Sequence, residues 1–333
     1  MDPYRHYYKP VHPLPPRRNL FRGRDLYGPI PRNEVKWHNL PHPSPNLDGL
    51  GQYEKFERNI LSEHAMVQNS FPRPHPSVDG QAVISNATNR YSQIPNNETR
   101  ECSRCGAVYS VQENGKAVKP EICKYHPHKT QKSFPHRCCQ GIPGTKPCKI
   151  ALQHVFEAMD LDNLTGFLRT KDNISVTSRE VYAVDTEMIY TEGGLEVGCL
   201  SIVNIDCNVV YQTVIVPSNH ILDYNTEMSK LSPLDFVGET TTIKRVHEKL
   251  QTLWGPNTIL VGHGLERDLL KLRVIHDKVV DTQVLYPHNK GPPFLNSLHN
   301  LKERYLSHQK YAKGSYKCSN EAIAVMSLTK LRV

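Results

Sequence analysis

From residue 180 to the end of the chain, apolar and polar residues follow patterns that predict alternating strands and helices. Short apolar runs and alternating segments predict strands at 181–184, 198–206, 208–216, 258–261 and 279–281. Apolar residues at helical spacing predict helices at 242–254, 265–272, 297–306 and about 319–331. Strands that come first and are followed by alternating helices and strands indicate a mixed α/β sheet covered by helices.

The first 97 residues have a different pattern, with few aliphatic residues and more than half of the 25 prolines. Such a stretch buries too little apolar surface to offset the entropy lost on ordering. We therefore interpret residues 1–97 as a largely disordered Pro/His-rich arm. Phe56, Ile60 and Leu61 fall at helical spacing, which is compatible with a short helix within residues 52–68.

Composition narrows the classes of protein that fit. The 333 residues carry a net charge of +8, which favours a polyanionic partner without identifying one. No apolar run approaches the roughly 18 residues of a membrane span, and the first residues lack the apolar region of a secretory signal. The nine cysteines are therefore expected in a reducing compartment, where metal binding is favoured over disulfides.

Residues 98–160 combine cysteines and histidines at the spacings of a zinc-binding module. The eight candidate ligands are Cys102, Cys105, Cys123, His126, Cys138, Cys139, Cys148 and His154. Eight ligands suffice for two closed tetrahedral sites, which are structural rather than catalytic. The spacing leaves open which ligands share an ion, and His128 and His136 are alternative ligands. In a second interpretation, Cys138, Cys139 and Cys148 are packed thiols.

Basic and aromatic residues lie between these ligands. The basic ones are Lys116, Lys119, Lys124, Lys129, Lys132, Arg137, Lys146 and Lys149, and the aromatic ones are Tyr109, Tyr125 and Phe134. Basic residues contact phosphates without reading sequence, and aromatic rings stack on bases. The module is thus predicted to contact RNA, with a solvated charged face as the alternative.

Four carboxylates lie in contexts suited to a shared metal site. Asp185 and Glu187 are two residues apart at the end of a predicted strand, so their side chains point to the same face. Asp268 lies in a predicted helix, and Glu321 lies in the last one. Converging carboxylates cannot all stay charged without cations between them, and Mg²⁺ or Mn²⁺ is the usual solution. A pair of such ions is a common device for hydrolysing a phosphodiester.

The order of these motifs resembles the RNA exonuclease 1/GOR branch of the DEDD 3′→5′ exonucleases. The matching segments are Asp185-x-Glu187, Gly262-His-Gly-Leu-Glu-Arg-Asp268, Val279-Val-Asp-Thr282 and Leu285-Tyr-Pro-His288. The resemblance implies a ribonuclease H-like domain at residues 178–333, a nuclear location, and the 3′ end of single-stranded RNA as substrate. It also implies that Asp185, Glu187 and Asp268 bind the catalytic metal ions. The Cys/His module is similar to the region that precedes the nuclease domain in this family.

The last motif departs from the family pattern of Gly-His, four residues and Asp-Ala. Here Tyr316 takes the place of the general-base histidine, and Glu321 takes the place of the fourth aspartate. A tyrosine with a pKa near 10 is a poor base at neutral pH. The longer arm of a glutamate displaces its ligand oxygens by roughly one bond length, and such shifts slow catalysis. We therefore assign both residues to the catalytic site and expect weakened activity.

These observations predict a metal-dependent 3′→5′ exoribonuclease that uses Mg²⁺ or Mn²⁺ for catalysis and contains one or two structural Zn²⁺ ions. The first alternative is a catalytically impaired RNA-binding protein that retains the exonuclease fold. Two further alternatives are a DNA exonuclease and an adaptor that binds protein partners through the Pro-rich arm. Basic clusters at residues 17–18 and 22–24 are compatible with the nuclear location.

Overall fold

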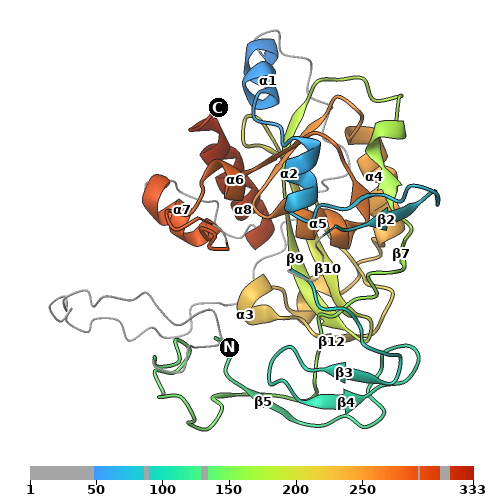
Figure 1. The fold of residues 1–333 in the computed structure, drawn as a ribbon, viewed down its shortest axis with the longest axis vertical. Helices are drawn as coiled ribbons and strands as arrows, with labels where there is room; N and C mark the ends of the chain where they lie inside the picture. Colours follow the sequence, from blue (N-terminus) through green and yellow to red (C-terminus); the bar gives the residue numbers. More distant parts are fainter. Residues whose placement is uncertain (1–48, 86–89, 129–133, 292, 308–315) are drawn as a thin grey trace, which may run out of the picture. The chain divides into compact units, whose positions relative to one another are not determined.

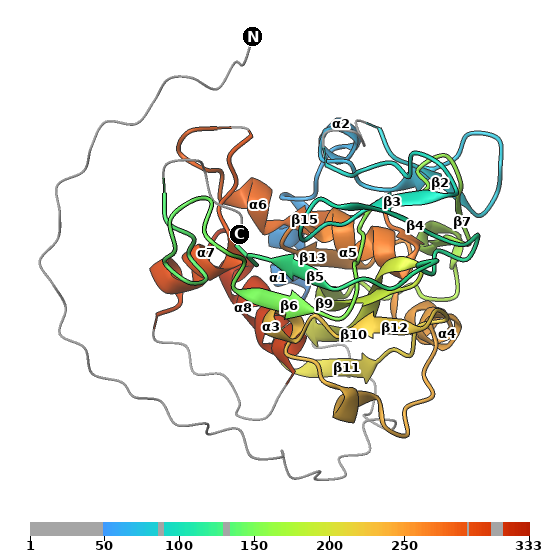
Figure 2. The ribbon, with the colours of Figure 1, turned by 90° about the horizontal axis from the view of Figure 1, so that it is seen from below.

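A six-stranded mixed sheet organises the computed structural model (Figure 1), which describes residues 49–85, 90–128, 134–291, 293–307 and 316–333. The strands are β9 (Val181–Thr191), β10 (Gly194–Asn204), β11 (Val209–Val214), β12 (Ile221–Asp223), β13 (Ile259–Gly262) and β15 (Val279–Asp281). They lie in the order β11, β10, β9, β13 and β15, and β12 also pairs with β9 (Figure 2). Strands β9 to β11 form an antiparallel meander, whereas β13 pairs in parallel with both β9 and β15.

Helices cover both faces of this sheet. They are α1 (Gly49–Glu57), α2 (Glu63–Gln68), α3 (Thr226–Ser229), α4 (Ile243–Leu253), α5 (Leu265–Leu272), α6 (Thr282–Leu285), α7 (Leu298–Tyr305) and α8 (Lys317–Lys330). Tyr182 and Val184 point to the face covered by α2, α4 and α5. Val181 and Ala183 point to the opposite face, against α1, α7 and α8. Alternate residues of β9 thus fill two cores, as the period of two in a strand requires. The prediction of a mixed α/β sheet covered by helices is confirmed.

The remaining elements are short. They are β1 (Arg73–Pro74), β2 (Gln81–Val83), β3 (Thr99–Glu101), β4 (Val108–Ser110), β5 (Cys123–Tyr125), β6 (Lys149–Ala151), β7 (Leu164–Thr165), β8 (Leu168–Arg169), β14 (Val274–Ile275), and the 3₁₀ helices η3 (Thr170–Asp172) and η4 (Pro233–Phe236). The Cys/His region contributes two antiparallel pairs, β3 with β4 and β5 with β6. No described helix has the length and apolar character needed to cross a bilayer.

Strand β9 is longer than its apolar pattern predicts, because it continues through Asp185 and Glu187 to Thr191. On one edge it pairs with β10 along most of its length. On the other edge, β13 pairs with residues 181–183 and β12 with residues 190–191. Among the described strands, none pairs with this edge between residues 184 and 189. The acidic residues therefore lie where the sheet leaves room for side chains from the helices.

The prediction of a disordered arm through residue 97 is wrong for the described part of that range. Residues 49–57 and 63–68 form α1 and α2. Tyr53 and Phe56 pack into one core of the sheet, and Met66 and Phe71 pack into the other. These side chains need no core of their own, because they complete cores that the sheet and its helices already form. Residues 1–48 lie outside the described part of the chain.

Candidate metal centre

Three acidic side chains converge at the unpaired stretch of the β9 edge. One carboxylate oxygen from each of Asp185, Glu187 and Glu321 lies within 4.8 Å of the others. The first two belong to β9, and Glu321 lies near the start of α8, which covers that face of the sheet. The structure therefore brings together three of the four acidic residues that the sequence assigned to a metal site.

The fourth acidic residue, Asp268, approaches from the α5 side of the sheet. Thr186, between the two acids of β9, donates a hydrogen bond to Asp268 Oδ1. The turn that carries α5 is held by Asp281, whose carboxylate accepts hydrogen bonds from Gly264 N (3.1 Å) and Leu265 N (2.8 Å). The end of β15 thus positions the helix that presents Asp268 to β9.

Burial makes the ionised forms of these carboxylates unfavourable. It raises the pKa of Asp268 to about 8 and the pKa of Glu187 to about 7. Burial, followed by repulsion from Asp268 and Glu321, raises the pKa of Asp185. Asp185 Oδ2 is buried and has no hydrogen-bond partner among the described residues. Oxygen donors that repel one another and include an unsatisfied atom fit a hard divalent cation such as Mg²⁺ or Mn²⁺.

Lys317 also lies in this cluster, although the sequence pattern assigned it no role. Its ammonium is 3.1 Å from Glu187 Oε1 and 3.4 Å from Glu321 Oε2. Burial acts to lower the pKa of Lys317, but attraction to Glu187 and Glu321 outweighs it and raises that pKa. The sequence held one signal for this contact, because Lys317 and Glu321 are four residues apart on one helix and that spacing favours an ion pair.

Tyr316, the predicted replacement for the general base, lies outside the carboxylate cluster. Its side chain packs beside Ile189, Leu231 and Cys318. Burial, followed by the negative charge of Asp235, raises its pKa. A general base must lie within hydrogen-bonding reach of the proton that it removes. The placement of Tyr316 therefore does not support the catalytic role that its position in the motif suggested, because its hydroxyl group is hydrogen-bonded to Asp235.

The eight Cys/His ligands divide into two sets of four. The first set is Cys102, Cys105, Cys123 and His154, and the second set is His126, Cys138, Cys139 and Cys148. Within the sets, sulfur atoms lie 3.5 and 3.7 Å apart, and sulfur and nitrogen atoms lie 3.4, 3.6 and 3.7 Å apart. Tetrahedral zinc separates neighbouring sulfur ligands by about 3.8 Å, and sulfur from nitrogen by about 3.5 Å. Both sets therefore fit zinc.

The fold decides the pairing that the spacing left open. His154 completes the first set, and its Nδ1 atom lies 3.4 Å from the sulfur of Cys105, which is 49 residues earlier in the chain. His136 belongs to neither set, and its ring stacks on His126 with the centroids 3.7 Å apart.

Cys148 is exposed, as is Cys139. The interpretation of these cysteines as packed thiols is therefore wrong for both.

Arg104 joins the first Cys/His set to the sheet. Its guanidinium carbon lies 4.9 Å from the ring centroids of both Tyr125 and Tyr190, and its Nη1 atom lies 2.7 Å from Asp223 Oδ2. Tyr190 belongs to β9, so the contact reaches the strand that carries the acidic residues. Tyr125 is engaged by this contact, and Tyr109 stacks on the histidine of the first set. These two rings therefore serve the packing of the module.

A second contact that sequence reasoning missed comes from residues 90 and 91. Arg90 Nη1 lies 2.5 Å from Glu266 Oε1, two residues before Asp268. Glu266 is buried, and this burial raises its pKa to about 7. The hydroxyl of Tyr91 is buried and lacks a hydrogen-bond partner among the described residues. No local pattern signals this contact, because Arg90 and Glu266 are 176 residues apart.

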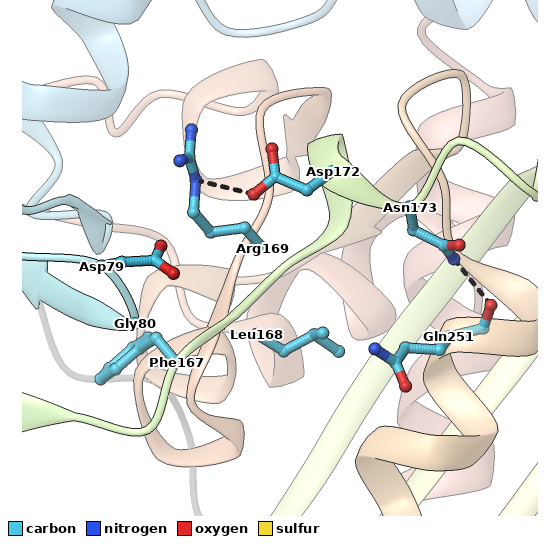
Figure 3. Close-up of a pocket in the computed structure, with 8 residues that line it drawn as sticks. All are labelled: Asp79, Gly80, Phe167, Leu168, Arg169, Asp172, Asn173 and Gln251. Carbon is cyan, nitrogen blue, oxygen red and sulfur yellow. Dashed lines mark hydrogen bonds and ion pairs between the residues drawn. The ribbon is translucent and has the colours of Figure 1, made fainter.

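A cavity of about 320 Å³ lies apart from these sites (Figure 3). It is lined by Asp79, Gly80, Phe167, Leu168, Arg169, Asp172, Asn173 and Gln251. Arg169 Nε lies 3.6 Å from Asp172 Oδ2, and Asn173 Nδ2 donates a 2.7 Å hydrogen bond to Gln251 O. None of the predicted site residues lines this cavity, and polar groups in its wall bind one another. We assign it no ligand.

Fold and site together define a mixed α/β protein with a carboxylate cluster and two Cys/His sets. No family model matches the chain. It is 36% identical over 270 residues to RNA exonuclease 1 homolog of Homo sapiens, covering 78% of this chain and 22% of the relative. It is 35% identical over 303 residues to Exonuclease GOR of Pan troglodytes, covering 88% and 44%. It is 30% identical over 305 residues to RNA exonuclease 3 of Eremothecium gossypii, covering 86% and 74%. The chain belongs to the RNA exonuclease 1/GOR family.

The chain spans less than half the length of the human and chimpanzee relatives. Among solved structures, it is similar to the catalytic unit of Neurospora crassa Pan2, with a TM-score of 0.41 and 19% identity. That similarity covers 62% of this chain and 30% of the Pan2 chain. Family membership rests on the sequence matches alone.

Proposed function

We propose that this chain is a metal-dependent 3′→5′ exoribonuclease with a ribonuclease H-like domain at residues 178–333. One observation carries the proposal: Asp185, Glu187 and Glu321 converge, with Asp268 close by, in a chain whose relatives are named RNA exonucleases. Acids that converge in this way need a cation or protons to offset their repulsion, and a divalent ion can offset more than one of them. The net charge of +8 favours a polyanionic substrate such as RNA.

The four acidic residues would hold Mg²⁺ or Mn²⁺. Bound divalent cations lower the pKa of water and stabilise the attacking and leaving oxygens of a phosphodiester. Asp185 is the central ligand of the proposal, because each of the other three acids acts on it electrostatically. Thr186 orients the Asp268 carboxylate through its hydrogen bond. Asp281 fixes the turn from which α5 starts, and so keeps Asp268 at β9.

A second candidate function is a catalytically impaired RNA-binding protein that retains the exonuclease fold. Two observations favour it over a fully active enzyme. Tyr316 lies outside the cluster, so the last motif supplies no base there. Lys317 places an ammonium between two of the proposed metal ligands. We therefore propose reduced rather than full activity as the primary function.

The other parts of the chain belong to the same proposal. The two Cys/His sets would each hold one structural Zn²⁺ ion and so stabilise the module at residues 98–160. The Pro-rich segment before residue 49 would bind protein partners. A nuclear location rests on the family resemblance and stays a prediction.

Digestion of a 5′-labelled single-stranded RNA tests the proposed function, with DNA of the same sequence beside it. We expect slow shortening from the 3′ end that requires Mg²⁺ or Mn²⁺. Asp185→Asn should abolish it, whereas Asp206→Asn, an exposed acid in the β10–β11 turn, should leave it unchanged. RNA binding without any shortening would favour the second candidate, shortening of DNA alone would indicate a DNA exonuclease, and the absence of both binding and shortening would refute both candidates.

A further inference from the structure

Lys317 is the first residue of α8 and reaches into the acidic cluster. Its ammonium lies 3.1 Å from Glu187 Oε1, 3.2 Å from Glu187 Oε2 and 3.4 Å from Glu321 Oε2. A lysine in the first turn of a helix faces the positive end of the helix dipole, which disfavours it there. The two glutamates, rather than the helix, therefore account for the position of this ammonium.

The Glu187 side chain is 5% exposed, and the Lys317 side chain is 30% exposed. A buried glutamate needs a cation or a proton to offset its lost hydration. Lys317 supplies that cation from within the chain. Because Lys317 keeps a path to solvent, its ammonium can leave the glutamates without disturbing the buried core.

We infer that Lys317 is a built-in cation that competes with a divalent metal ion for Glu187 and Glu321. This inference rests on the proposed function, in so far as the acidic cluster is a metal site. Oxygen ligands lie only about 2.1 Å from Mg²⁺. An ion held by both glutamates would therefore overlap the ammonium, so the two cations exclude each other. With Lys317 in place, Asp185 and Asp268 remain available to one ion.

The consequence is a site that binds one divalent ion tightly and a second ion only when Lys317 withdraws. Such a site would be active only where the metal concentration is high enough to displace the ammonium. This would account for the reduced activity proposed above in a chain that retains all four acids. The residue that limits metal binding is then Lys317, and not Tyr316, which occupies the general-base position of the motif.

Binding of Mn²⁺ to the zinc-loaded 333-residue chain, without RNA, tests the inference. Stoichiometry and affinity would be measured by electron paramagnetic resonance and by calorimetry. We expect one tight Mn²⁺ in the parent protein and two in Lys317→Met, with the second ion bound about tenfold or more tightly than in the parent. Lys317→Arg keeps the charge and should behave as the parent does. Lys330→Met removes one charge from the far end of the same helix and should also match the parent.

Equal stoichiometry and equal affinity in Lys317→Met and the parent would overturn the inference. Lys317→Gln repeats the test with a polar side chain if the methionine variant does not fold, and thermal unfolding checks that both variants are folded.

The proposed function can fail independently of the inference about Lys317. If Lys317→Met gains an ion but neither protein shortens RNA, the inference stands and the nuclease assignment fails. If the parent shortens RNA and Lys317→Met gains no ion, the inference alone fails. If Asp185→Asn leaves Mn²⁺ binding unchanged, the cluster is not a metal site and both fail.

Discussion

Replacing Arg104 by alanine should loosen the Cys/His module from the sheet and lower the free energy of unfolding by about 2–4 kcal/mol. The guanidinium lies between the rings of Tyr125 and Tyr190, at 4.9 Å from each centroid, and bonds Asp223 at 2.7 Å. Tyr125 belongs to the module, whereas Tyr190 and Asp223 belong to β9 and β12. One side chain thus connects two parts of the fold.

The magnitude follows from these contacts. Each ring contact contributes about 0.5–1 kcal/mol at a partly buried site. Loss of one partner from a fully buried ion pair costs about 3–5 kcal/mol. The Asp223 side chain is 30% exposed, so water compensates part of that loss and about 1–2 kcal/mol remains. Arg104→Lys keeps the charge but loses the planar stacking group, and should cost about half as much as Arg104→Ala.

Urea unfolding of the zinc-loaded protein, followed by circular dichroism, measures these effects. Arg169→Ala is the matched control, because Arg169 pairs at 3.6 Å with an Asp172 side chain that is 60% exposed. Such a surface pair is worth at most about 1 kcal/mol. In a double-mutant cycle, Arg104→Ala and Asp223→Asn should fall short of additivity by about 1 kcal/mol. If Arg104→Ala costs no more than Arg169→Ala, the reasoning about this contact is wrong.

Three further predictions concern the metal sites. Elemental analysis should find two zinc ions per chain in the parent and in the control variant Cys207→Ser. It should find one zinc ion in Cys123→Ser and one in Cys148→Ser, because these two substitutions each remove a ligand from a different set. Two zinc ions in Cys123→Ser or in Cys148→Ser would contradict the pairing. In metal-free protein, burial raises the pKa of Asp268 from an ordinary value of 3.8 to about 8. Between these two values the folded state binds a proton that the unfolded state releases, so the free energy of unfolding falls as pH rises from about 4 to 8. Adding Mg²⁺ should therefore raise the melting temperature more at pH 8 than at pH 5, and an equal gain at both would refute the assignment. Tyr316→Phe should leave the rate of RNA shortening within about twofold, because its hydroxyl group is engaged with Asp235 and not with the acidic cluster. Loss of activity in a folded variant would restore the catalytic role that the motif suggested.

Much of the fold could be predicted from local pattern. The strand at 279–281 and the helix at 265–272 have the bounds that their apolar spacing indicated. The run at 181–184 marked the start of β9 but not its end, because the period-two core pattern stops where the acids begin. The spacing of Phe56, Ile60 and Leu61 was compatible with a short helix within residues 52–68, which overlaps α1. The burial of Tyr53 and Phe56 could not be predicted, because they pack in a core built by residues more than 120 positions later.

For the site, the sequence by itself determined which residue types could bind metal, because Asp185, Glu187 and the Cys/His ligands have chemistry that few structural roles require. Only the tertiary structure decided which of them meet. His154 joins the first set and His126 the second because chain path, not spacing, sets those distances. The same holds at the start of α8, where Tyr316 packs against the cluster that contains Ile189 and Leu231, and Lys317 lies beside two glutamates. Tyr316 is the extended residue before the helix and Lys317 is the first helical residue, so their side chains leave the backbone in different directions. Which of them faces the metal site depends on how α8 packs on the sheet.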